Sequence, residues 1–249
     1  MDRLIYTAMS GAAQTLNRQA SVAHNLANVS TDGYRSEEHR LRAVQVQSRN
    51  AGSLPTRAFA VDASTHTDFS SGPLINTART LDLAVAGRGW IALQMPDGSE
   101  AYTRAGSLEL NVNGVLQTRN GVPVMGDGGP ITVPPDNKIF IGTDGTISVV
   151  PETGAQNTVN AIGRIKLVDP PEDTLRRGAD GLFRTVDGGA APLSESTRIA
   201  SGFVEGSNVN PVEQMVSMIS LGRQFEMQMK MISSADQNDR AATQVINSR

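Results

Sequence analysis

Apolar and small residues recur along residues 4 to 28 with alternating spacings of four and three. One polar residue, Gln19, fills the remaining position of this row. The pattern is the heptad repeat of a helix that packs along one seam. The turn-forming residues from Ser30 to Gly33 are expected to end the helix. The row consists of Ile5, Met9, Ala12, Leu16, Ala23 and Leu26.

The other faces of this helix carry almost no charge. Arg18 is the only charged residue between Leu4 and Ser30, and glutamine, asparagine, serine and alanine stand where Glu and Lys are usual. Such a surface loses its water at little cost, which favours contact with other protein. Burial inside an ordinary domain would produce the same pattern, so the sequence alone leaves that alternative open.

A second helix is expected near the C-terminus. Asn210 and Pro211 have the order of an N-cap and a first-turn proline, and the helical pattern then runs to about Asn247. Two adjacent apolar stripes imply contacts on more than one side, and the methionines within them are interpreted as packing residues. One stripe contains Val212, Val216 and Ile219, and the other contains Met215, Met218, Phe225, Met229 and Ile232.

Signals for strands and tight turns dominate residues 81 to 185. Alternating apolar runs are separated by hairpin-type pairs such as Asn113-Gly114 and Asp144-Gly145. This stretch is therefore predicted to form an antiparallel β domain.

The remaining segments, 34–80 and 186–205, are rich in Ser, Thr, Ala and Gly. We interpret them as extended connectors between the β domain and a helical part made of residues 1–33 and 206–249. The expected fold class is α+β.

Composition narrows the function classes. A net charge of −3 and an aromatic content of 4% argue against nucleic-acid binding, which normally needs a basic surface and stacking rings. The chain has no cysteine, which excludes disulfides, thiolate metal sites and cysteine nucleophiles. We expect no Sec signal peptide, because the first residues lack its apolar core, and no membrane insertion, because no apolar run is long enough.

No pattern indicates catalysis, a metal or a cofactor. The histidines His24, His39 and His66 lack the spacing of a helical metal motif, and nucleotide-binding loops and nucleophile elbows are absent from the sequence. A glycosidase pair of carboxylates is set by space and not by sequence. The acidic residues of the β region stand mostly in turns, however, where Asp bonds to the backbone. The sequence therefore predicts that the protein is not an enzyme.

Three ordered segments resemble the flagellar rod and hook proteins. Residues 25 to 34, Asn-Leu-Ala-Asn-Val-Ser-Thr-Asp-Gly-Tyr, are similar to the segment that closes the N-terminal helix in that family. Residues 206 to 210, Gly-Ser-Asn-Val-Asn, are similar to the segment that opens its C-terminal helix. Residues 81–90 and 102–107 resemble its β region. The sequence near the N-terminus and the sequences of residues 128–134 and 223–230 resemble those of a proximal-rod component of the family.

The resemblance implies that the two terminal helices pair as an antiparallel coiled coil that lines a tube, with the β domain outside. It implies a structural subunit of the rod that crosses the periplasm, with other rod proteins and copies of itself as partners. Export would use the flagellar type III apparatus. The heptad row of the first helix is then expected to pack within the subunit. Asn25, Asn28, Asn208 and Asn210 would hold the helix ends, beside the signature glycine Gly33.

Two other functions stay open at this point. The first is a distal-rod or hook subunit of the same family, which shares the three segments. The second is an exported β domain that binds or hydrolyses cell-wall glycan, with helical ends for dimerisation. The lack of a signal peptide and the few aromatic residues count against it.

Overall fold

The computed structural model describes residues 2–45, 58–151 and 159–247. The fold is α+β, with one helix near each end of the chain and a β-rich region between them. The chain divides into two compact units. Unit 1 combines Met1–Val29, Arg35–Asp68 and Val209–Arg249, and unit 2 combines Ser30–Tyr34 and Phe69–Asn208.

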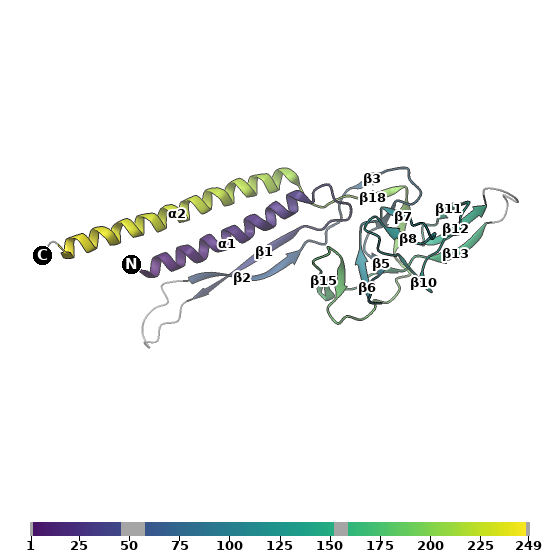
Figure 1. Cartoon of the computed structure of the whole chain (residues 1–249), viewed down its shortest axis with the longest axis horizontal. Coiled ribbons are helices and arrows are strands. Elements are labelled where there is room, and N and C mark those ends of the chain that lie inside the picture. The colour runs from purple at the N-terminus through teal and green to yellow at the C-terminus, as the bar shows by residue number, and fades with distance from the viewer. Residues whose placement is uncertain (1, 46–57, 152–158, 248–249) are drawn as a thin grey trace. The chain divides into compact units, whose positions relative to one another are not determined.

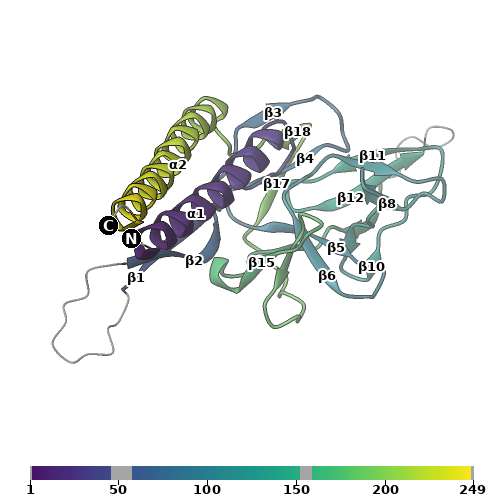
Figure 2. The same cartoon turned by 60° about the vertical axis from the view of Figure 1, so that its left-hand side comes forward.

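Unit 1 contains two helices and a long β-hairpin. Helix α1 spans Asp2–Ala27 and helix α2 spans Pro211–Asn247. They lie side by side and run in opposite directions (Figure 1 and Figure 2). Strands β1 (Glu37–Gln45) and β2 (Ala58–Thr67) pair antiparallel and pack against α1.

The hairpin occupies part of the segment 34–80, for which the sequence predicted an extended connector. The side chains of β1 and β2 are mostly exposed on both faces of the ribbon. A strand without a buried face lacks the alternation of apolar and polar residues by which strands are recognised. Segment 186–205 likewise contains two short strands, β17 (Arg198–Ser201) and β18 (Phe203–Glu205), which pair with other strands of unit 2.

Unit 2 consists of short antiparallel strands. Its largest sheet has five strands in the order β14-β5-β6-β16-β15, and another has the order β11-β12-β13. The other strands form the pairs β3-β18, β4-β17, β7-β8 and β9-β10. The bounds are β3 (Leu74–Asn76), β4 (Leu83–Ala86), β5 (Trp90–Gln94), β6 (Glu100–Thr103), β7 (Leu108–Leu110), β8 (Leu116–Thr118), β9 (Met125–Gly126), β10 (Gly129–Pro130), β11 (Asn137–Ile141), β12 (Thr146–Pro151), β13 (Asn160–Arg164), β14 (Leu167–Val168), the 3-10 helix Glu172–Thr174, β15 (Leu175–Arg177), β16 (Phe183–Thr185), β17 (Arg198–Ser201) and β18 (Phe203–Glu205).

Two apolar clusters form the core of unit 2. Leu83, Ile91 and Leu93 belong to the first, and each side chain is fully buried. The second surrounds Trp90, whose ring centre lies 4.6 Å from that of Phe183. These clusters give unit 2 a core that contains no residue of either helix.

Candidate assembly surface

One face of α1 packs against α2. Ala8, Ala12 and Thr15 are buried and follow one another at helical spacing. The Thr15 hydroxyl lies 3.2 Å from Oε1 of Gln228, and a Cβ atom at Gly11 would come within 3.1 Å of the Gln228 amide nitrogen. Small residues thus let the two helices approach closely.

The matching face of α2 is a heptad row. Leu221 and Ala235 are buried, and the other members of the row are half-buried. Their alternating spacings of four and three keep the row on one side of the helix. The row consists of Gln214, Met218, Leu221, Phe225, Gln228, Ile232 and Ala235.

A second face of α1 holds the hairpin through polar contacts. Ser10 donates a hydrogen bond to the carbonyl of Ala60 (2.9 Å), and Ser21 donates to the carbonyl of Glu37 (2.8 Å). The buried Asn25 side chain donates to the Glu37 carbonyl at 2.9 Å and accepts from the Glu37 amide at 3.0 Å. The Asn25 side chain therefore hydrogen-bonds both backbone groups of Glu37 at the start of β1, as a neighbouring strand would.

Replacing Asn25 with alanine is expected to loosen the hairpin. The Glu37 amide loses the Asn25 acceptor, whereas the Glu37 carbonyl loses the Asn25 donor but keeps the bond from Ser21. Weakening the pairing of a buried backbone group in this way costs about 1–3 kcal/mol. Amide hydrogen exchange at Glu37 should accelerate. The control is Asn28→Ala, which removes a hydrogen bond to the His24 carbonyl at the helix end and should leave exchange at Glu37 unchanged. Unchanged exchange in Asn25→Ala would show that the Asn25 side chain does not hold the strand.

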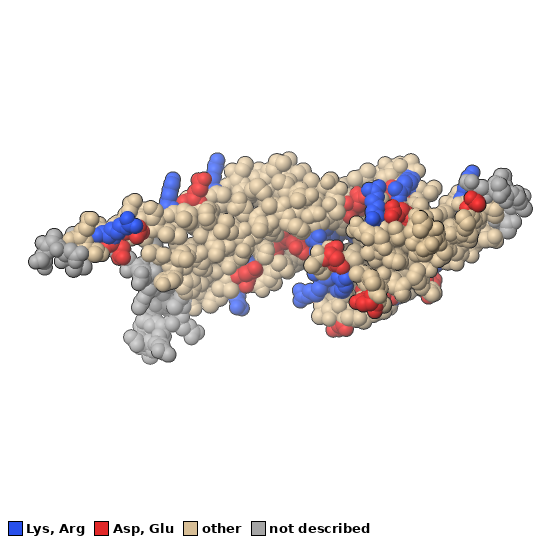
Figure 3. All heavy atoms as spheres, viewed as in Figure 1, with Lys and Arg blue, Asp and Glu red and all other residues tan. Residues whose placement is uncertain are grey.

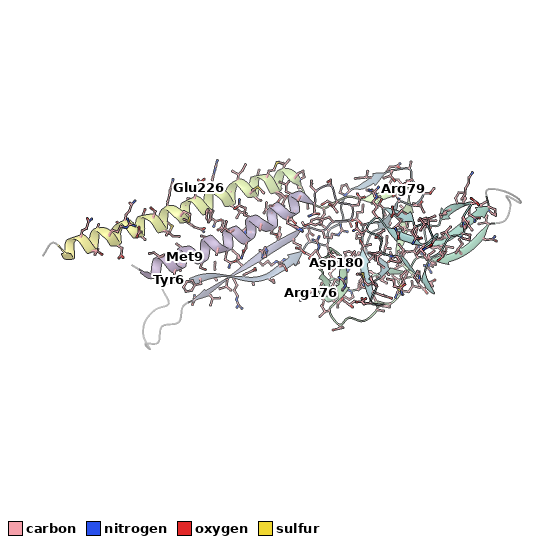
Figure 4. The ribbon with its side chains drawn as sticks, in the orientation of Figure 1. Tyr6, Met9, Arg79, Arg176, Asp180 and Glu226 are labelled. Atoms are coloured by element: carbon pink, nitrogen blue, oxygen red, sulfur yellow. The ribbon has the colours of Figure 1, made fainter. Side chains whose placement is uncertain are left out.

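The third face of α1 is an apolar row open to solvent. Tyr6, Met9 and Leu16 are 62%, 53% and 49% exposed. Figure 4 labels the first two on the N-terminal half of the helix. Alanines complete the row at heptad spacing, and all of its members are exposed. The exposed row consists of Tyr6, Met9, Ala13, Leu16, Ala20, Ala23 and Ala27.

Helix α2 also presents bulky apolar side chains to solvent over its first turns. Val212, Val216 and Ile219 are 68%, 62% and 59% exposed, and Met215 is 52% exposed. Figure 3 shows the charged side chains of the helical unit gathered in small groups with uncharged surface between them. Soluble monomeric proteins rarely expose so many large apolar side chains next to one another, and such patches mark sites of protein contact.

The row of α1 that packs against α2 differs from the row that the sequence predicted. Ala12 lies in the helix pair and Ile5 and Leu26 are half-buried, whereas Met9, Leu16 and Ala23 are exposed. The predicted row lies between the buried row and the exposed row of the helix and shares members with both, so spacing alone does not separate them.

The predicted stripes of α2 divide in a similar way. Met218, Phe225 and Ile232 are half-buried in the helix pair. Met229 is 46% exposed, and Met215 and the stripe of Val212, Val216 and Ile219 are exposed as well. Leu221 was missed, although its heptad spacing to Met218 and Phe225 was visible in the sequence.

The predicted helix-end residues have different partners. Asn210 is the N-cap of α2, since its side-chain oxygen accepts from the amides of Val212 (3.1 Å) and Glu213 (3.4 Å). Asn28 donates to the His24 carbonyl at the end of α1 (2.9 Å). Asn208 instead donates to the Ser70 carbonyl in unit 2, and Asn25 binds the hairpin.

Gly33 has a backbone conformation and an environment that exclude a side chain. Its φ is +67°, and a Cβ atom would lie 2.3 Å from the amide nitrogen of Ala105. Its own amide donates to the carbonyl of Glu205 at 2.7 Å. Only glycine fits this approach of two backbone segments within unit 2.

We therefore expect Gly33→Ala to lower the free energy of unfolding of unit 2 by at least about 2 kcal/mol, from left-handed strain and the clash together. Trp90 is the single tryptophan of the chain and is buried in unit 2, so its fluorescence reports unfolding there. The control is Gly98→Ala, where φ is +83° and no atom lies within 4 Å of the added Cβ. Equal losses in both variants would rule out the clash.

Several carboxylates of unit 2 have structural partners. Asp144 accepts from the amide and hydroxyl of Thr146 at 3.1 and 2.7 Å, and these bonds lower the pKa of Asp144. Asp169 and Glu172 pair with Arg88 beside Trp90, at a cavity of about 40 Å³. Small-molecule sites usually enclose at least about 300 Å³, so this cavity is too small for a sugar ring.

The described residues contain neither a membrane-spanning helix nor a metal-binding cluster. No helix within 2–45, 58–151 and 159–247 has the length and apolar character needed to cross a membrane. The same part of the chain contains no cluster of three or more His, Asp or Glu side chains able to hold a metal ion.

Three family models match consecutive parts of the chain. "Flagella basal body rod protein" matches residues 5–35, and "Flagellar hook protein FlgE/F/G D1 domain" matches residues 84–149. "Flagellar basal body rod FlgEFG protein C-terminal" matches residues 200–245. The first and last of these matches contain the exposed apolar residues of α1 and α2.

Full-length relatives agree with these matches. The flagellar basal-body rod protein FlgF of Salmonella typhimurium is 46% identical over 99% of both chains. FlgF of Escherichia coli is 45% identical with the same coverage, and FlgG of Bacillus subtilis is 29% identical over 95% of this chain. This chain belongs to the family of flagellar basal-body rod proteins, and within it to the FlgF type.

Proposed function

We propose that this chain is a structural subunit of the proximal rod of the bacterial flagellum. The observation that carries the proposal is the uncharged, exposed heptad row along α1 in a chain of this family. A helix in water normally covers such a face with charged residues. The row extends over roughly 30 Å of helix, and packing against neighbouring subunits would remove it from water.

The function in this proposal is mechanical. α1 and α2 form an antiparallel coiled coil, and the helix pairs of successive subunits build a tube. Contacts that join different faces of identical or homologous subunits do not close on themselves and therefore generate helical assemblies. Such a tube transmits torque and encloses a channel through contacts alone, so the chain acts without catalysis.

The partners and location follow from the same proposal. The partners are other rod proteins of this axial family together with copies of this chain. The subunit reaches the rod, which crosses the periplasm, through the flagellar type III export apparatus. The FlgF proteins of Salmonella typhimurium and Escherichia coli are 46% and 45% identical to this chain, against 31% for a FlgG protein of Buchnera aphidicola, which supports the proximal rod over the distal rod or hook.

Mass spectrometry of purified hook–basal bodies from the native host tests the proposal. A proximal-rod subunit should be present at low copy relative to the hook subunit. High copy would move the chain to the distal rod or hook. Absence from intact basal bodies would refute a role in the rod.

A further inference from the structure

One surface of α2 has the form of a coiled-coil hole. The outer side of the helix has a hollow, called here the Ser220 hollow. It is lined by Val216, Ile219, Ser220, Arg223, Gln224 and Met227. The positions 216, 219, 220 and 223 have the spacing i, i+3, i+4 and i+7 of four residues that receive one side chain of a facing helix. No residue of α1 contributes to the lining of this hollow, which faces away from the buried row of α2.

The exposed row of α1 provides a side chain of the right form. Leu16 is 49% exposed and stands between Ala13 and Ala20, both exposed as well. Alanines before and after a leucine let a second helix approach closely while the leucine projects from the row. The row has no charged member, so nothing in it repels Arg223, whose aliphatic stem can cover apolar surface at the rim.

The two features lie at similar heights along the helix pair. Gln228 of α2 lies beside Gly11 and Thr15 of α1. Because the helices run in opposite directions, residues 216 to 227 of α2 lie beside the part of α1 that follows Thr15. Leu16 and Ala20 belong to this part, so a neighbouring helix pair can meet it with little axial displacement.

We propose that Leu16 of one subunit inserts into the Ser220 hollow of a second copy of this chain in the rod. The inference rests on the proposed function and specifies which faces meet. Two different faces take part, one on α1 and one on α2, so a joined pair of copies retains one free α1 face and one free hollow. The contact therefore propagates from copy to copy and produces an open assembly instead of a closed dimer.

Disulfide crosslinking tests this contact, since the chain has no cysteine of its own. The double variant Leu16→Cys/Ser220→Cys is produced in flagellated cells, oxidised, and examined in purified basal bodies. We expect roughly tenfold more disulfide-linked dimer than in either single variant, because a disulfide needs Cα atoms within about 7 Å. The matched control is Leu16→Cys/Glu226→Cys, since Glu226 is exposed on α2 outside the hollow (Figure 4).

The outcomes separate this inference from the proposed function. Mass spectrometry of the same preparation shows whether the variant has entered the basal body. Its presence without a dimer, or with equal dimer in the control, overturns the Leu16 contact and leaves the rod assignment intact. Absence of the wild-type chain from basal bodies refutes the rod assignment itself. If Leu16→Cys blocks incorporation, Ala20→Cys/Ser220→Cys replaces it, with the same expected dimer and the same contradicting result.

Discussion

Cells that carry Ala23→Glu are expected to lose swimming, and the variant chain should be missing from their basal bodies. Ala23 is exposed in unit 1, so the substitution should change the free energy of unfolding of the isolated chain by no more than about 0.5 kcal/mol. In the rod the new carboxylate would be buried against a neighbour without a partner. Leaving a buried charge unpaired costs on the order of 3–5 kcal/mol, and each subunit would repeat that cost.

The control for this variant is Asn17→Glu. Asn17 is also exposed on α1 but lies outside the apolar row. Soft-agar motility and immunoblots of purified basal bodies compare the two variants, and Trp90 fluorescence checks that unit 2 remains folded. Normal swimming with Ala23→Glu would exclude the row from the assembly surface.

Loss of either partner of the Arg104–Glu205 ion pair is expected to destabilise unit 2 strongly. The two side chains are 4% and 1% exposed, with Nη1 of Arg104 2.9 Å from Oε2 of Glu205. Arg104 also donates to the Gly87 carbonyl at 2.7 Å, and Glu205 accepts from the Gly72 amide at 3.0 Å. Arg104→Ala or Glu205→Ala leaves one buried charge without its partner, so we expect a loss of about 3–5 kcal/mol.

Urea unfolding followed by Trp90 fluorescence measures this loss. The control is Arg88→Ala, since Arg88 is 70% exposed and its carboxylate contacts are 3.7 and 3.9 Å long. Exposed pairs of this kind contribute at most about 1 kcal/mol. Removing both Arg104 and Glu205 should cost less than the sum of the single losses, because the two groups interact. Additive losses would show that the pair is not coupled.

The sequence predicted the helices well because their signals are local. Asn210 and Pro211 mark the start of α2, and the structure begins that helix at Pro211 with Asn210 as its cap. The turn residues after Asn28 likewise follow the end of α1 at Ala27. Caps and breakers act over a few residues and can therefore be seen without the fold.

The sequence could not decide which row of α1 faces its own subunit. The intrasubunit face uses Ala8, Gly11 and Thr15, because close approach to α2 needs small residues. Larger residues such as Met9 and Leu16 point outward. Hydrophobic size normally indicates burial, but in a subunit of a larger assembly it also indicates surfaces that other copies cover.

Other features depend on residues far apart in the chain. Arg104 and Glu205 are 101 positions apart, and nothing near either residue indicates the pairing. The Glu37 backbone is held by Asn25 across a turn, and the hairpin that follows has little buried side-chain surface. Contacts of this kind follow from the packed structure and not from the local pattern.

Thiol labelling at position 23 tests the central claim, that the exposed row of α1 becomes buried between subunits. Ala23→Cys provides the only thiol in the chain. We expect a maleimide reagent to label it in the free protein and at least roughly tenfold more slowly in purified basal bodies. Labelling should recover when the basal bodies are dissociated. Equal labelling rates in the free and assembled states would contradict the account.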